Sequence, residues 1–533
     1  MKTSKLFFKT TILLTAVALA GCAGDDAVQG EKQGSGKATA NNVTFIGESV
    51  QPTRANSPAT RTSLTHSIGN GATPYWSTGD KIWAKDNYGR WTESQEGVFN
   101  EDNTRGTFSI AGSFNSGCEI HYTGANSTSG TEVTIAANQT QSTPNDFSHA
   151  GVSGDCGTGT ASGSGNQLKF RLKHQASYLC FQPRTLNNYV KHSKLIKIEV
   201  TSEDDIAGTY DFSNGKLSPS PKSSASKTIT LTTGGSDGFP ITNEKADLSV
   251  NGSYIVIAPG QHALTIRYWL RNKKDVPFGN LSDTHPIEGT VTKTINIDCK
   301  PGIIYDITAN LNPQDYSSKY YMWDAKVGQD YWKGHEKDQP TIDKGQHASF
   351  PHGVNDDRWY NERAFPAKAY RSCADCPNAN ECSWYVMKGD PHWDKEELWT
   401  AMGYIHTGGM WFKKQAYIND YSPYRSVNGT DYTTKDESCY YTNNQVPTGR
   451  PSHINEYFYL PALGGYDNGA FSGIENYGAY WTSTPTPMNG NPGAATRGAY
   501  YLFFGFSDNG HSGYAHVYGG LNRYKGFRLW TAE

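Results

Sequence analysis

The chain has 533 residues, a formal net charge of −3 and only 19% charged residues. This length predicts about three domains, and 36% hydrophobic residues with abundant Gly and Tyr predict a folded, strand-rich protein. The near-neutral charge argues against nucleic acid as a partner, because phosphate binding needs a concentrated basic surface.

The N-terminus has the three parts of an export signal. A lysine-bearing start precedes the apolar stretch 11–20, which is too short to span a bilayer. Residues 19–22 then read Leu-Ala-Gly-Cys and match a lipobox, in which the cysteine thiol takes a diacylglycerol. We therefore predict a lipoprotein signal peptide over residues 1–22, with the lipid attached to Cys22. The alternative is an ordinary signal peptide with a chance cysteine.

The stretch after Cys22 predicts where the anchored chain resides. Asp25 and Asp26 follow the cysteine closely, and such acidic residues resemble the surface-export signals of some gut-bacterial lipoproteins. Residues 23–42 are rich in Gly, Ser and Lys, which is typical of a flexible tether. We expect a protein held by its lipid on the outer face of the outer membrane.

Eight cysteines remain besides Cys22, and an even number in an exported chain permits disulfides of unknown connectivity. Four of them have a spacing that could bind zinc: Cys373, Cys376, Cys382 and Cys439. Only one Cys-x2-Cys pair is present, so disulfides or buried free thiols are the favoured interpretation and these four are weak metal candidates. We expect no cofactor.

From Val43 to residue 311 the sequence predicts short strands separated by turns every 8 to 12 residues or so, as in β-sandwiches. Apolar and polar residues alternate within them, which places one face of each strand on a core and the other in water. The predicted strands include 43–47, 131–135, 168–172, 195–200, 228–231 and 253–257.

Several weak motifs follow the lipobox in a fixed order, at residues 59–62, 76–82, 170–179, 206–210 and 254–260. This order resembles that of the fimbrillin-like (Mfa-like) lipoprotein pilins of gut and oral bacteria. The resemblance implies two antiparallel β-sandwich lobes, which we place at 43–175 and 176–312, and partnership with other pilin subunits through strand exchange.

In that family the first strand of the precursor fills a groove on its own sheet. A protease cuts after an arginine, and a strand of another subunit then completes the open sheet edge. The candidate first strand here is Val43–Val50. Arg61 stands at the family's Arg-Thr position and Arg54 is the second candidate for cleavage. The alternative is that both arginines are ordinary solvated loop residues.

The C-terminal third has a different residue pattern and is rich in Trp and Tyr. Its clearest predicted helix is 394–405, because Asp394 and Glu397 have capping-box spacing and later apolar residues share one face. The order of its motifs resembles the C-type-lectin-like fold of formylglycine-generating enzymes and of Fibrobacter major paralogous-type domains. The resemblance implies an α+β domain over residues 313–533, with core positions for Trp481, Phe527 and Arg528.

Catalytic motifs are missing from this third. Formylglycine-generating enzymes hold copper with a late cysteine pair, whereas this chain has no cysteine between Arg497 and Glu533. The Gly-x-Ser-x-Gly and His-Glu-x-x-His motifs are also absent. We therefore expect no enzymatic activity and assign no catalytic residue.

Residues 505–524 have the composition of a recognition surface. Tyr supplies large contact area at low entropic cost, and Ser, Gly and Asn adapt their hydrogen bonds, as in antibody paratopes. The segment also resembles the variable regions of retroelement-diversified lectin-fold proteins, although it could be a Gly-rich surface loop. The predicted ligand-binding residues are Ser507, Asp508, Asn509, His511, Tyr514, His516, Tyr518 and Asn522.

These features together predict a surface-anchored adhesin of the fimbrillin type whose lectin-like domain binds a glycan or a protein ligand. After proteolysis it would pass from the membrane into a pilus. The chain ends three residues after Trp530, inside its predicted closing strand, so we expect a tip or accessory subunit without a strand to donate. The alternatives are a non-polymerising surface lipoprotein that binds polysaccharide, and an uncharacterised enzyme.

Overall fold

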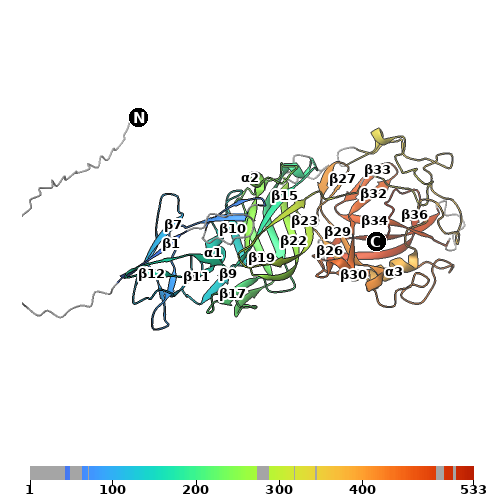
Figure 1. Cartoon of the computed structure of the whole chain (residues 1–533). Helices are drawn as coiled ribbons and strands as arrows, with labels where there is room; N and C mark the ends of the chain where they lie inside the picture. Colours follow the sequence, from blue (N-terminus) through green and yellow to red (C-terminus); the bar gives the residue numbers. More distant parts are fainter. Residues whose placement is uncertain are drawn as a thin grey trace, which may run out of the picture. The chain divides into compact units, whose positions relative to one another are not determined.

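The computed structural model describes residues 42–48, 63–69, 71–272, 287–316, 319–341, 345–487, 497–507 and 512–532. Strands dominate these residues, which confirms the predicted mostly-β fold class (Figure 1). No helix within the described ranges is long and apolar enough to cross a membrane. The predicted lipidation site Cys22 and the cleavage candidates Arg54 and Arg61 lie outside the described residues.

Two sheets pack face to face around a first hydrophobic core. One has the strand order β12-β13-β1-β7-β6 and the other β14-β11-β8-β4-β5. Phe45 and Phe108 from the first sheet and Ile120 and Leu172 from the second belong to one buried cluster, so this part is a β-sandwich. The strands are β1 (Asn42–Glu48), β4 (Trp83–Lys85), β5 (Trp91–Glu93), β6 (Val98–Phe99), β7 (Arg105–Ala111), β8 (Glu119–Tyr122), β11 (Gly157–Thr160), β12 (Ser162–Ser164), β13 (Gln167–Phe170) and β14 (Leu172–His174).

A second core lies under the sheet β10-β19-β16-β22-β23, in which β20 also pairs with β16. The sheets β21-β15-β24 and β18-β17-β9 and the β2–β3 hairpin add side chains to it, among them Leu64 and Val133, which precede residue 176. The lobe boundary at 175/176 stays a prediction. Two short helices, α1 (Ala150–Ser153) and α2 (Leu248–Asn251), join these strands. The strands are β2 (Ser63–Ser67), β3 (Gly71–Tyr75), β9 (Glu132–Ile135), β10 (Asn138–Gln141), β15 (Ser177–Arg184), β16 (Ser193–Thr201), β17 (Ala207–Asp211), β18 (Ser223–Ser226), β19 (Thr228–Thr233), β20 (Phe239–Pro240), β21 (Ser253–Ile257), β22 (Gly260–Asn272), β23 (Ile287–Cys299) and β24 (Ile304–Asn310).

A third core, rich in Trp and Tyr, is built on the sheet β30-β36-β35-β34-β32-β33 and two three-stranded sheets, β25-β27-β28 and β26-β29-β31. Trp481 and Phe527 lie in this core, as predicted. Arg528 is outside this buried cluster: it is partly buried, and its guanidinium donates to the carbonyl of Lys319 at 2.6 Å. The elements are β25 (Gln314–Asp315), α3 (Ala379–Lys388), β26 (His392–Asp394), β27 (Trp399–Ala401), β28 (Tyr404–His406), β29 (Gly409–Lys413), β30 (Tyr440–Val446), β31 (Tyr457–Pro461), β32 (Leu463–Asp467), β33 (Ala470–Ile474), β34 (Tyr477–Pro485), β35 (Gly498–Ser507) and β36 (Ser512–Asn522).

The predicted helix over residues 394–405 is wrong. This stretch forms the end of β26 and the hairpin β27–β28. Met402 (φ 52°) and Gly403 (φ 88°) form a two-residue turn with positive φ at both positions, a geometry that closes a hairpin and breaks a helix. Asp394, the expected cap, instead accepts hydrogen bonds from the backbone N–H of Glu396 and the indole N–H of Trp411.

The longest α-helix of the described residues is α3, which the sequence analysis missed. Its start carries a complete capping box: the Asn378 side chain accepts from the backbone N–H of Glu381, and the Glu381 carboxylate accepts from that of Asn378. The Asn-x-x-Glu spacing at residues 378–381 is typical of a helix start and is the sequence signal for α3.

Although β1 is the first described strand, it lies in the middle of its sheet. It pairs in parallel with β13 over Thr44–Gly47 and antiparallel with β7 over its full length. Its side chains Val43, Phe45 and Ile46 are buried. The strand predicted at Val43–Val50 is therefore confirmed over the described residues. Without β1, the edge of β13 and the edge of β7 that now pair with it would both lack hydrogen-bond partners.

Phe45→Ala is expected to lower the free energy of unfolding by about 3–5 kcal/mol, because it leaves a cavity under a fully buried ring. Glu48→Ala, at the partly exposed end of the same strand, should change it by less than about 0.5 kcal/mol. Urea unfolding of both variants measures the difference. Equal small effects would contradict the placement of β1 in the first core.

Candidate functional site

The strands β30, β36, β35 and β34 carry a continuous aromatic surface on one side of their sheet. Side chains alternate along β36: Ala515 and Val517 are buried, whereas Tyr514, His516 and Tyr518 point to the other side and stay partly exposed. The neighbouring strands supply four more rings. We call this surface the aromatic face and define it as Tyr440, Tyr477, Tyr501, Phe503, Tyr514, His516 and Tyr518.

Strand register brings these rings into contact. Phe503 lies opposite His516, with ring centroids 4.9 Å apart and planes 10° from parallel. Tyr477 also stacks on Phe503, with ring centroids 5.0 Å apart. Tyr518 meets Tyr440 edge to face at 5.4 Å. Cross-strand aromatic pairs of this kind stabilise a sheet, and they also fix the rings as one rigid surface.

The aromatic face is uncharged at neutral pH but carries polar groups, the tyrosine hydroxyls and the His516 imidazole. Burial lowers the pKa of His516 to about 4 and raises the pKa of Tyr501 to about 12, so the imidazole is neutral and the phenol keeps its proton. Tyr440 and Tyr518 are 61% and 45% exposed. Rigid rings with accessible hydroxyl groups suit recognition of a ligand by contact area and neutral hydrogen bonds.

The structure brings together three of the predicted ligand-binding residues, Tyr514, His516 and Tyr518, on one strand. The other two described residues lie at the ends of the strand pair: Ser507 closes β35, and Asn522 ends β36, where its amide donates to the Tyr524 hydroxyl at 3.0 Å. Asp508, Asn509 and His511 lie outside the described residues. The described part of segment 505–524 is mainly strand, not the alternative Gly-rich loop.

Sequence reasoning missed the partners of these residues on other strands, namely Tyr440, Tyr477, Tyr501 and Phe503. Part of the signal was present, because Tyr501 and Phe503 alternate with the buried Leu502 and Phe504. The contribution of Tyr440 depends on the pairing of β30 with β36, which joins residues far apart in the sequence.

The eight cysteines of the described residues are all free thiols, and seven are buried. Burial raises the pKa of Cys373 and of Cys382 well above the usual value, so both are protonated. The Cys373 sulfur accepts the backbone N–H of Asp324 at 3.1 Å. Cys373, Cys376, Cys382 and Cys439, all of them described, do not bring three metal-ligating atoms together.

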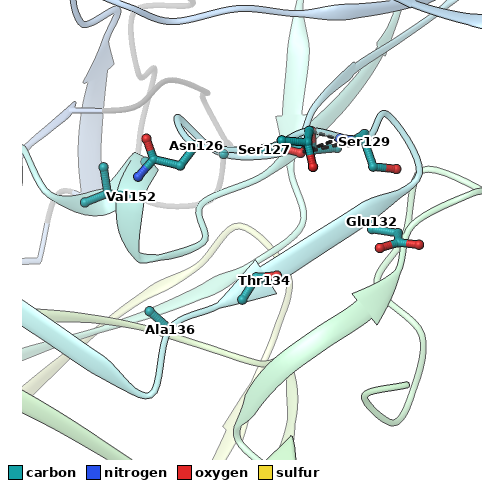
Figure 2. A pocket seen from close by; sticks show the side chains of 11 residues that line it. Asn126, Ser127, Ser129, Glu132, Thr134, Ala136 and Val152 are labelled. Atoms are coloured by element: carbon teal, nitrogen blue, oxygen red, sulfur yellow. Dashed lines mark hydrogen bonds between the residues drawn. The ribbon is translucent and has the colours of Figure 1, made fainter. Parts of the chain in front are cut away.

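Two hollows in other parts of the described chain are not lined by an aromatic surface of this kind. A polar one of about 310 Å³ lies between the 123–129 loop, β9 and α1 (Figure 2). In this hollow the Ser127 hydroxyl donates to the carbonyl oxygen of Ser129. Glu132, the only carboxylate of the lining, forms an ion pair with Lys222. A larger one of about 610 Å³ borders α3.

Two of the three carboxylates that line the larger hollow, Glu381 and Asp431, accept hydrogen bonds from neighbouring side chains; the third is Asp375. Glu381 caps α3 and accepts from the Tyr421 hydroxyl at 2.9 Å. Asp431 accepts from Asn380 at 2.9 Å and from Thr433 at 2.6 Å.

Solved structures of candidate cell adhesion proteins resemble part of this chain. One from Bacteroides ovatus is 12% identical, with 50% of this chain and 91% of that chain covered and a TM-score of 0.31. One from Bacteroides fragilis is 9% identical, with 50% and 92% covered and a TM-score of 0.28. One from Bacteroides eggerthii is 10% identical, with 51% and 86% covered and a TM-score of 0.28.

No protein-family model matches the chain, and no curated protein gives a significant match.

His516 is expected to titrate with a pKa near 4, because the aromatic face shields its ring from water. An unfolded histidine titrates near 6.5, so between these values the unfolded state binds more protons. The contribution of His516 to the free energy of unfolding is thus fully present above pH 6.5 and is lost as the pH falls toward 4. NMR of the ring protons during a pH titration measures the pKa, and a value near 6.5 would contradict this burial.

Proposed function

We propose that this chain is a surface-anchored, non-catalytic adhesin of the fimbrillin type that binds a glycan or a protein ligand through the aromatic face. In this proposal Cys22 holds the lipid anchor on the outer membrane, and the C-terminal domain, residues 313–533 with a lectin-like fold, presents the binding surface.

The observation that carries the proposal is the aromatic face itself. Seven neutral rings from four strands form one contacting set. Tyr477, Tyr501 and Phe503 also pack against the third core, whereas Tyr440 and Tyr518 are exposed to solvent. Exposed aromatic surface costs solubility, and on soluble proteins such patches mark sites of interaction. No charged or metal-based chemistry is needed for recognition of this kind.

The position of β1 supports the strand-exchange part of the proposal. A strand that enters the sheet from the N-terminal side and pairs on both edges can be removed with one cut in the connection to β2. The groove left between β13 and β7 would accept a strand from a pilin partner by main-chain hydrogen bonding.

A tip or accessory position is supported by the packing of residues 526–530. Gly526, Phe527 and Arg528 form single bridges with Tyr466, Tyr321 and Tyr480. The indole N–H of Trp530 donates to the Trp481 carbonyl at 2.8 Å within the third core. These residues complete their own domain, so we propose that they are not donated to another subunit.

Tyr518→Ala and Tyr440→Ala should each weaken ligand binding at least about tenfold, roughly 1.4 kcal/mol, because each removes an exposed ring of the aromatic face. The full chain is screened on glycan and protein arrays, and affinities for the strongest partner are then measured for each variant. Tyr424→Ala is the matched control, since this tyrosine of the same domain is 79% exposed and lies outside the face. Equal affinities in all three variants would contradict the proposed surface.

Processing is tested separately. An arginine-specific protease should produce a mature chain that begins at Thr62. Arg61→Ala should prevent the cut that creates this N-terminus, whereas Arg54→Ala should leave the N-terminus at Thr62. Both arginines stand between β1 and β2 in the sequence, so a cut at either separates the two strands. N-terminal sequencing of the protein from the cell surface reads the result. A surface chain that keeps lipidated Cys22 in all cases would contradict strand exchange.

A further inference from the structure

Three side chains from distant parts of the chain meet where the β2–β3 hairpin joins the second core. His66 lies on β2, Cys180 on β15 and Asp306 on β24. One imidazole nitrogen, the thiol sulfur and one carboxylate oxygen all lie within 4.8 Å of one another. This is the only group of three or more potential metal ligands in the part of the chain that the structure describes.

The hydrogen bonds of His66 direct a lone pair into this cluster. Its Nδ1 lies 3.0 Å from the carbonyl oxygen of Gly71, and a carbonyl only accepts, so Nδ1 carries a proton. In the neutral ring Nε2 is then an acceptor, yet it lies 2.8 Å from Oδ1 of Asp306, a second acceptor. Two acceptors at this distance need either a proton or a metal ion between them. Metal-ligating histidines are typically held in this way through the nitrogen that does not bind the ion.

The surroundings fix the ligand atoms in place. The backbone N–H of Gly69 donates to Oδ2 of Asp306 at 3.0 Å, so Oδ1 is the oxygen that faces His66 and Gln182. The Tyr254 ring packs edge to face against His66 with centroids 5.9 Å apart. His66 and Cys180 are buried, whereas the Asp306 side chain keeps 25% of its exposure and opens the cluster to solvent.

Gln182 adds a fourth polar group. Its amide nitrogen lies 2.5 Å from Oδ1 of Asp306 and 3.6 Å from the Cys180 sulfur. Its amide oxygen is buried without a hydrogen-bond partner. A half-turn of the amide exchanges the two atoms and turns the oxygen toward the cluster, where a cation would satisfy it.

We propose that His66, Cys180 and Asp306 form a zinc site, with the amide oxygen of Gln182 as the fourth ligand. One thiolate, one imidazole and oxygen donors suit tetrahedral Zn²⁺, whereas Ca²⁺ and Mg²⁺ select all-oxygen sites. The ion displaces the thiol proton of Cys180 to solvent and ties the β2–β3 hairpin to β15 and β24. This inference does not depend on the aromatic face or on pilus assembly.

The test titrates Zn²⁺ into the full chain with its cysteines reduced, in competition with a chromophoric chelator. One equivalent is expected to bind, and Cys180→Ser, His66→Gln and Asp306→Asn should each weaken binding about 100-fold or more, since the loss of outer-shell partners alone costs 10–100-fold. Near-UV circular dichroism checks that each variant is folded. Co²⁺ in place of Zn²⁺ should give a thiolate charge-transfer band that Cys180→Ser lacks.

Two controls separate this site from the other thiols. Cys299→Ser changes a buried cysteine of the same core, and a double variant, Cys373→Ser with Cys376→Ser, removes the Cys-x2-Cys pair. Both should bind Zn²⁺ and Co²⁺ like the wild type. The proposal is overturned if the wild type binds no Zn²⁺, if the Co²⁺ complex lacks the thiolate band, if the three ligand variants bind normally, or if the double variant abolishes binding.

Discussion

The twofold alternation of side chains along β35 and β36 is the constraint on which the candidate site depends. The same two strands pack Leu502, Phe504 and Val517 into the third core and hold Phe503 and His516 on the opposite side. A shift of register by one residue would exchange the two sets, burying polar hydroxyls and exposing aliphatic side chains. Core stability therefore fixes the aromatic face in one arrangement before any ligand is bound.

A second constraint is the route of the N-terminal strand. β1 pairs in parallel with β13, more than a hundred residues later in the chain, and antiparallel with β7. Such long-range pairing makes the first core depend on a strand joined to the rest by a single connection. The next element, β2, is held elsewhere, by the bridge from Leu64 to Phe147 and by the contact of His66 with Asp306. Loss of β1 would thus leave β2 anchored to the second core.

The sequence predicted the strands of the first two cores because apolar alternation is a local signal, as at Ile198 and Val200 in β16 or Ile229 and Leu231 in β19. It predicted a helix at 394–405 wrongly, because spacing cannot show that Met402 adopts positive φ in a hairpin turn. Composition identified three of the seven residues of the aromatic face, namely Tyr514, His516 and Tyr518. The rest, like the three side chains around Cys180, depends on pairing between strands far apart in the sequence, which a single sequence does not reveal.

Hydrogen exchange of the full chain, with and without its strongest array ligand, tests most directly whether the aromatic face is where binding occurs. The backbone amides of β30, β35 and β36 should exchange more slowly with ligand present, while those of the 123–129 loop and β9 stay unchanged. Protection confined to that loop, or to the hollow beside α3, would contradict the account.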